Sequence, residues 1–259
     1  MVVCAVSLAA VGGLTLVQRL VSSERRQEHN DVAGFIYAVL GVIYAVLLAL
    51  VVIAAWESYE RARITVEEEA NAAAEIFWLA HWMPQPQGRE LQEAVRSYAK
   101  DVVDKEWPLM EQGKTPLMES TQETPTGWVL IDDIRVRLHG FEPRTEAEQD
   151  LYAEGLDQIQ RLADSRRMRL VAASESMPAV LWIVMIFGGV VTVGFTYLFG
   201  LRNTWAHRLM VASLAAVIAL VLFTIGSLDH PFSGGTHISP GAFELILDRF
   251  ETSKLSDLR

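Results

Sequence analysis

The chain has 259 residues, of which 51% are hydrophobic, and its formal net charge is −10. Its hydrophobic residues gather in a few long runs, which indicates a membrane protein rather than one large soluble domain. The negative charge lies within residues 57–177, which argues against partners such as nucleic acid or anionic lipid surfaces. The single cysteine, Cys4, excludes a disulfide framework and a cysteine-based zinc site.

The first expected span covers residues 2–21 and contains one charge, Arg19, near its end. No basic segment precedes the apolar run, so a spanning helix is a better interpretation than a cleaved signal peptide. Arg19 can extend from the end of this helix to the membrane interface.

The second expected span begins at Val32 and carries no formal charge as far as Trp56. This run exceeds the ~20 residues that a helix needs to cross a bilayer. Charged residues then follow, with no Pro or Gly before Pro84. We therefore expect one long helix that leaves the membrane and continues into water.

Two neighbouring stripes mark the membrane part of this helix. The first consists of small residues, which let another helix approach closely: Gly34, Ala38, Gly41, Ala45 and Ala49. The second recurs every seven residues: Asn30, Tyr37 and Tyr44. Tight helix packing is the simpler explanation for any one of these residues, and a pore is the alternative. The pore-lining candidates are Asn30, Gly34, Tyr37, Gly41 and Tyr44, and Ala38 and Ala45 are assigned to helix packing.

Residues 57–176 are expected to form an acidic, helical soluble domain. An amphipathic pattern predicts a helix over 89–106, which we expect Trp107-Pro108 to stop. Residues 111–127 are rich in Gly, Pro, Ser and Thr and predict a loop. Residues 128–138 fit a helix or a short strand, and we choose the helix because a lone strand would have no partner. Thr145 to Glu148 has the sequence of a capping box.

An acidic cluster, Glu67, Glu68 and Glu69, lies shortly after the second span. It could form a ring that attracts cations in an oligomer, although a solvated helix face is the commoner meaning of such a run. Three basic residues, Arg166, Arg167 and Arg169, lie at a similar distance from the membrane on a neighbouring helix. We expect these arginines to pair with the acidic cluster.

The third and fourth expected spans cover residues 177–201 and 209–228. Small residues recur at strict four-residue spacing in the third span and predict a second close-packing face: Gly188, Thr192, Thr196 and Gly200. Four spans place both termini and the middle domain on one side of the membrane. The arginines near the spans are divided almost evenly, so they do not identify that side.

Residues 229–259 begin with a turn-rich segment that contains Asp229, Pro231, Phe232 and Gly234. For Asp229 we favour a structural role, such as capping a helix or binding an arginine, over ion selectivity. Ser239-Pro240 then predicts the start of a C-terminal amphipathic helix.

Several short pieces of the chain are distinctive: Gly34 to Ala45, Trp56 to Tyr59, Glu69-Ala70, Tyr98, Glu106 to Met110, Arg166, Arg169-Leu170, Pro178, Leu181-Trp182 and Asp229 to Gly234. Over nearly the whole chain, these pieces resemble the bestrophin-like family of bacterial four-span membrane proteins. The resemblance implies similarity to bestrophins, which are pentameric anion channels with a helical cytosolic domain. It therefore implies a bacterial inner membrane protein whose soluble domain is cytoplasmic. The acidic calcium-binding cluster of animal bestrophins is absent, so calcium gating is not implied.

The sequence contains no P-loop, GxSxG, HExxH or Rossmann pattern, so we do not expect an enzyme, a metal site or a cofactor. No acidic or basic residue lies in the middle of a span, which argues against a proton-coupled pump but not against a channel. We predict an all-α integral membrane protein with four transmembrane helices and a helical extramembrane domain formed by extensions of spans two and three. Residues 1–56 and 177–228 hold the spans, 57–176 the soluble domain and 229–259 the C-terminal turn and helix.

The predicted function is a homo-oligomeric ion channel with its pore lined by span two. Its partners would be the lipid bilayer, further copies of itself and ions, and not nucleic acid. The alternative is a non-conducting scaffold or signalling protein whose acidic domain recruits a partner.

Overall fold

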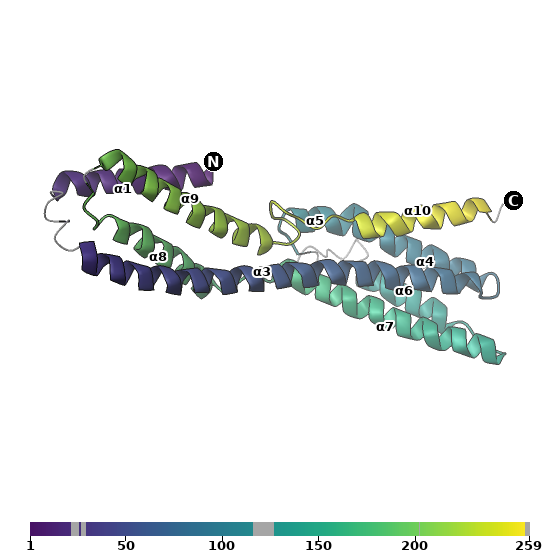
Figure 1. The fold of residues 1–259 in the computed structure, drawn as a ribbon. Helices are drawn as coiled ribbons and strands as arrows, with labels where there is room; N and C mark the ends of the chain where they lie inside the picture. The colour runs from purple at the N-terminus through teal and green to yellow at the C-terminus, as the bar shows by residue number, and fades with distance from the viewer. Residues whose placement is uncertain (22–25, 27–29, 116–126, 202, 257–259) are drawn as a thin grey trace. The chain divides into compact units, whose positions relative to one another are not determined.

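The computed structural model describes residues 1–21, 26, 30–115, 127–201 and 203–256, and these residues contain helices and no strand. The elements are α1 (Val2–Leu20), α3 (Asn30–His81), α4 (Gln87–Asp101), the π-helical segment η1 (Val102–Glu106), α5 (Trp107–Glu111), α6 (Gly127–His139), α7 (Glu146–Ser174), α8 (Ala179–Thr196), α9 (Thr204–Leu228) and α10 (Gly241–Ser256) (Figure 1). They form two compact units. The membrane unit comprises Met1–Glu57 and Met177–Asp229, and the soluble unit comprises Ser58–Ser176 and His230–Arg259.

Among the described residues, four helices are long and apolar enough to cross a membrane: α1, the first part of α3, α8 and α9. Their outer surface carries large apolar side chains that are mostly exposed, such as Phe35, Ile43 and Phe187. Such exposure is unfavourable in water but suits helices surrounded by hydrocarbon. The predicted all-α, four-span fold is confirmed.

Within the membrane unit, α1 lies along α9 (Figure 1). Leu14 of α1 is fully buried in this contact, together with Val211 and Ala215 of α9. Small side chains such as Ala215 allow the two backbones to approach closely. Helix α8 packs against α9 and, through Tyr44, against α3.

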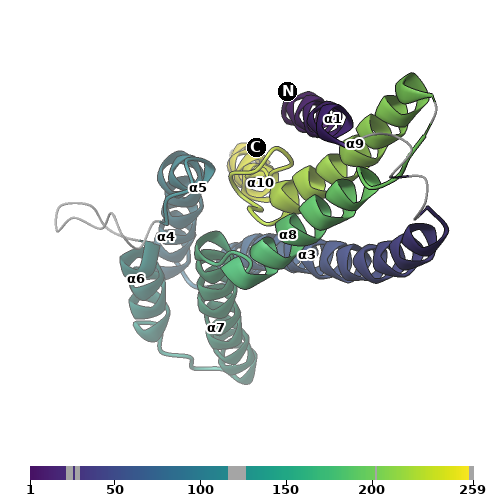
Figure 2. The same cartoon turned by 90° about the vertical axis from the view of Figure 1, so that its left-hand side faces the viewer.

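The second span is the beginning of a continuous helix of 52 residues, α3, as the absence of Pro and Gly predicted. Beyond the membrane unit its buried face consists largely of small residues, among them Ala70, Ala73 and Ala80. The core of the soluble unit also includes Ile76 and Phe77 of this helix. In this unit α4 packs on α6, and α6 packs on α7 (Figure 2).

The prediction that Trp107-Pro108 stops the helix is wrong. Helix α4 passes through η1 into α5, and Pro108 occupies one of the first positions of α5. Proline is tolerated there because a first-turn residue needs no intrahelical N–H bond, and the π-helical segment changes the direction of the following side chains.

Helix α5 ends instead at Glu111, and Gly113 follows its C-cap with a φ of 73°, in the left-handed region that favours glycine. Its N–H donates to the carbonyl of Met110 at 2.9 Å, and the N–H of Lys114 donates to that of Leu109 at 2.9 Å. These two bonds form a Schellman motif, which satisfies the last carbonyls of the helix. Most of the loop expected over 111–127 lies outside the described residues.

The ambiguous segment 128–138 lies within helix α6, which confirms the helix over the strand. The capping box is also confirmed: Thr145 Oγ1 accepts from the N–H of Glu148 at 3.2 Å, and Glu148 accepts from the N–H of Thr145 at 3.0 Å. The helix that it opens, α7, ends at Ser174, where the backbone becomes extended at Glu175. A separate helix, α8, therefore forms the third span.

Helix α8 ends at Thr196, before the end of the uncharged run. The carbonyls at this end and just beyond it are bound by side chains from other segments. Arg26 donates to the carbonyls of Tyr197 and Phe199, each at 3.3 Å, and His207 contacts that of Thr196 at 3.0 Å. The bound carbonyls stabilise an early helix end inside an apolar segment.

Candidate functional site

Tyr44, in the membrane part of α3, joins this helix to α8. Its hydroxyl donates to the carbonyl of Met185 at 2.9 Å, and its side chain is buried. A Cβ atom at Gly188 would lie 2.7 Å from two carbons of the Tyr44 ring, and a Cβ at Gly189 would lie 2.9 Å from its hydroxyl. Both glycines are therefore needed for the ring to lie against the α8 backbone.

The other two members of the seven-residue stripe also contact α8 or the segment after it. The side-chain amide of Asn30 donates to the carbonyl of Gly200 at 3.1 Å and accepts from its N–H at 3.1 Å. The Tyr37 ring stacks on Phe195 at a centroid distance of 5.9 Å and lies edge to face with Phe199 at 5.7 Å. The whole stripe therefore attaches α3 to its own chain.

The small-residue stripe of α3 has a different environment. A Cβ atom at Gly34 or Gly41 would meet nothing within 4 Å among the described atoms. Ala38 and Ala45, on the same face, are exposed. This open face, defined by Gly34, Ala38, Gly41 and Ala45, has space for another helix or for a water-filled path.

The small residues of α8 are largely enclosed. Gly188 lies against Tyr44, Gly200 is buried beside Asn30, and Thr192 is 3% exposed. Thr196 Oγ1 donates to the carbonyl of Val193. The hydroxyl of Thr192 has no hydrogen-bond partner within the part of the chain that the structure describes.

Glu69, Glu106, Arg166 and Arg169 meet in the interior of the soluble unit, and we call them the buried ion cluster. Arg169 donates to Glu69 at 2.6 and 2.9 Å and to Glu106 at 2.7 Å. Arg166 donates to both carboxylate oxygens of Glu106, at 2.8 and 2.6 Å. The Tyr98 hydroxyl donates to Glu69. Two acidic and two basic groups therefore neutralise one another away from water.

Aromatic rings enclose the two guanidinium groups. That of Arg166 lies 5.3 Å from the centroid of the Trp128 ring and 5.9 Å from that of Tyr98. That of Arg169 lies 5.9 Å from the centroid of Trp107. Such contacts favour arginine over lysine, because a planar guanidinium can stack on rings while its N–H groups bind carboxylates. A Cβ at Gly127 would collide with the Arg166 guanidinium, which explains a glycine at the start of α6.

The electrostatics of the cluster favour the charged forms. Burial alone would raise the pKa of Glu106, but the charge of Arg169 and the hydrogen bonds of Arg166 outweigh it and lower this pKa. Burial would lower the pKa of Arg169, but the charges of Glu69 and Glu106 raise it well above its usual value. The arrangement has the properties of a structural ion network, since the partners described above occupy most of its donors and acceptors.

The expected pairing of the acidic run with the arginines is confirmed for Glu69 and Arg169. Other members of the two groups have different partners. Arg166 binds Glu106 in the interior instead of the acidic run. At the surface, Glu67 pairs with Arg63 at 2.6 Å, and Arg167 pairs with Asp164 at 2.9 Å. Glu68 is exposed.

Sequence reasoning missed Glu106 as the partner of both buried arginines. A signal was present, because Glu106 directly precedes the apolar residues Trp107 to Met110, where an unpaired carboxylate would be costly. Glu69, Tyr98, Glu106, Arg166 and Arg169 were all among the pieces that carry the family resemblance, and the structure brings them together.

Asp229 lies at the end of α9. Its carboxylate accepts from the backbone N–H of Met177 at 2.7 Å and from the indole N–H of Trp182 at 3.3 Å. It therefore connects the end of the fourth span to the chain that enters the third.

The other residues of the turn-rich segment that begins at Asp229 belong to the soluble unit. The carbonyl of Pro231 accepts from the N–H of Ile238 at 2.8 Å, and the N–H of Gly234 donates to the carbonyl of His230 at 2.8 Å. Phe232 is buried, and its ring and that of Trp107 meet edge to face at a centroid distance of 5.8 Å. Through Trp107, the turn packs next to the buried ion cluster.

These features define a multi-pass helical membrane protein in which a spanning helix with an open face continues into a soluble helical unit. The sequence profile of the Bestrophin-like domain matches residues 4–243, and the chain belongs to this family.

Solved structures share the fold. Two are crystal structures of a bacterial bestrophin homolog from Klebsiella pneumoniae, each carrying a different mutation. They are 11% and 12% identical to this chain, with TM-scores of 0.71 and 0.72. The comparisons cover 96% and 97% of this chain and 97% and 100% of those chains.

A third crystal structure, described as that of a membrane protein, has a TM-score of 0.69 at 12% identity, with 96% of each chain covered. No curated protein matches the chain.

Proposed function

We propose that the protein is a passive ion channel whose pore is lined by the membrane part of α3 from several copies of the chain. The observation that carries this proposal is the open face of α3. Gly34 and Gly41 have empty space beside them although the neighbouring stripe residues, Tyr37 and Tyr44, pack on the same chain. Membership of the Bestrophin-like family supports the same function.

The proposed pore surface consists of small residues and exposed backbone. A passive pathway needs no ionisable residue, because backbone dipoles, hydroxyls and apolar constrictions control conduction in many channels. Asn30, Tyr37 and Tyr44 would lie behind this surface and fix the rotation of α3. Their contacts with α8 and the following segment leave the open face directed away from the protomer.

We further propose that the protein resides in the inner membrane of a bacterium with the soluble unit in the cytoplasm, as the family resemblance implies. A protease added to inverted vesicles should then cleave the soluble unit, whereas the same protease should leave it intact in sealed right-side-out vesicles. The opposite pattern would place the unit on the outer side.

Ion flux into liposomes that contain the purified protein tests the channel. We expect flux above that of empty vesicles, and we expect Gly41→Leu to reduce it strongly because the leucine would project into the pathway. Gly12→Leu is the matched control. A Cβ at Gly12 also meets nothing within 4 Å among the described atoms, but this residue lies on α1.

Absence of flux from the wild-type protein across a range of pH and ion types would overturn the channel proposal. The protein would then be better explained as a scaffold that recruits a partner through its acidic helices.

A further inference from the structure

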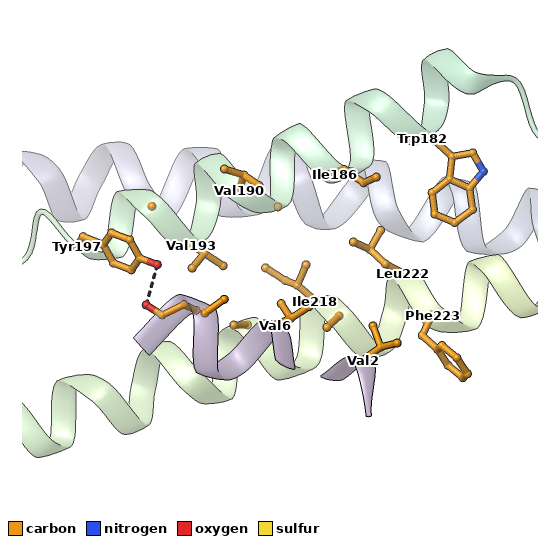
Figure 3. Close-up of a pocket in the computed structure, with 16 residues that line it drawn as sticks. Val2, Val6, Trp182, Ile186, Val190, Val193, Tyr197, Ile218, Leu222 and Phe223 are labelled. Carbon is orange, nitrogen blue, oxygen red and sulfur yellow. Dashed lines mark hydrogen bonds between the residues drawn. The ribbon is translucent and has the colours of Figure 1, made fainter. Parts of the chain in front are cut away.

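A cavity of about 610 Å³ lies within the membrane unit, between α1, α8 and α9 (Figure 3). Branched apolar side chains line it: Val6 from α1, Ile186 and Val190 from α8, and Ile218 and Leu222 from α9. Ile218 is buried, whereas Ile186 and Val190 are 52% and 65% exposed, so the cavity opens onto the outer surface of the membrane unit. Its volume lies within the ~300–1,000 Å³ that is usual for sites that bind small molecules. It is distinct from the open face of α3, which contributes no residue to its lining.

The side chains that line the cavity are poorly suited to holding water. Two of them have polar tips, and both tips are bound elsewhere. The Tyr197 hydroxyl donates to the carbonyl of Ala10 at 2.8 Å, and the Trp182 indole donates to Asp229 at 3.3 Å (Figure 3). A buried water needs about 2–4 polar partners, so an apolar occupant suits this cavity better.

The occupant must come from the surroundings of the three helices, which are the hydrocarbon chains of the bilayer. A methylene group occupies roughly the ~30 Å³ of a water molecule, so the cavity has room for about 20 such groups. That number corresponds to one acyl chain.

We propose that this cavity binds one acyl chain of a membrane phospholipid. The acyl chain lies between α8 and α9, against Val6 of α1. It fills space that the three helices leave between them. The cavity is thus a lipid site built into the fold, and its occupancy does not depend on ion conduction.

Gly194 provides the test variant. It lines the cavity, and a Cβ atom at this position would meet nothing within 4 Å among the described atoms. Leucine at this position therefore fits the backbone and fills part of the space that the acyl chain would occupy. Gly12→Leu is again the control, since Gly12 has equal space around it but does not line the cavity.

The full-length protein is reconstituted in phosphatidylcholine vesicles with a small fraction of a phospholipid that carries a photoreactive diazirine in mid-chain. After irradiation, mass spectrometry of peptides locates the label. We expect labelling of Ile218 and Ala219, which line the cavity and are buried, to exceed that of Phe187, which is 67% exposed. Gly194→Leu should reduce the cavity labelling several-fold and leave Phe187 unchanged, whereas Gly12→Leu should change neither.

Equal labelling of cavity and outward residues in the wild-type protein would overturn the proposal, as would cavity labelling that Gly194→Leu does not reduce. Loss of the Phe187 signal as well would indicate that the variant does not fold. In that case, native mass spectrometry of the wild-type protein tests whether the cavity holds a lipid. One phospholipid retained per chain after extensive detergent washing supports the site, and complete loss overturns it.

Discussion

Arg169 binds two carboxylates from different segments while its side chain is fully buried. Glu69 comes from α3 and Glu106 from the end of η1, so one guanidinium group connects both segments to α7. The cost of removing these charges from water is high, and it is offset only if each charge keeps its partners. The buried ion cluster therefore specifies one arrangement of these helices, because any shift would leave a buried charge unpaired.

Replacing Arg169 with methionine should destabilise the soluble unit by ~3–5 kcal/mol, since it leaves the buried Glu69 without its guanidinium partner. The apparent Tm in detergent, measured from tryptophan fluorescence, should fall by about 10 °C. Arg167→Met is the matched control. Arg167 is mostly exposed and pairs with the exposed Asp164, so its loss should cost no more than ~0.5 kcal/mol. Equal effects of the two substitutions would contradict the role assigned to the cluster.

Which arginine binds which carboxylate could be predicted only in part. Residues 69 and 169 were expected to be neighbours because both lie a few turns beyond a span on adjacent helices, and this local geometry was sufficient. Glu106 was not expected there because helix α4 was predicted to end at Trp107-Pro108. The π-helical segment keeps the chain helical and turns Glu106 toward the interior, and no simple periodicity predicts such a segment.

At the scale of elements, the contact between α3 and α8 depends on the pairing of a large residue with small ones. The Tyr44 ring occupies the space that Cβ atoms at Gly188 and Gly189 would otherwise need. The four-residue spacing on α8 predicted a close-packing face, but spacing alone does not identify the partner. The partner proved to be the tyrosine stripe of α3 rather than its small-residue stripe, because a ring and a glycine fill the space better than two glycines do.

Gly188→Ala should weaken this contact. The new methyl group would lie 2.7 Å from the Tyr44 ring, so the ring or the helix must shift, at a cost of about 1–3 kcal/mol. Gly194→Ala, on the same helix, has open space and should be neutral or slightly stabilising. The apparent Tm of the two variants gives the comparison. The double variant Gly188→Ala with Tyr44→Ala should recover part of the loss, and strictly additive effects would show that the two residues do not interact.

At the scale of the whole molecule, the lengths and types of the spans could be predicted from uncharged runs, because hydrocarbon excludes charge and unsatisfied backbone groups. The ends of the spans could not be predicted equally well. The helix of the third span stops at Thr196 because Arg26, Asn30 and His207 bind carbonyl groups near its end, and these residues come from other segments. Tertiary contacts of this kind are invisible to a local pattern.

The open face of α3 leads us to expect a particular kind of assembly. We expect four or more copies around an axis in nanodiscs, because a smaller assembly leaves no axial path bounded by the open faces. Mass photometry of the wild-type protein measures the number of copies. Ala45→Trp should lower this number, since a bulky ring on the open face prevents close approach of neighbouring α3 helices. Gly12→Trp adds the same ring to α1 and should leave the number unchanged. A wild-type monomer or dimer would contradict a shared pore and would direct attention to partners of the acidic soluble unit.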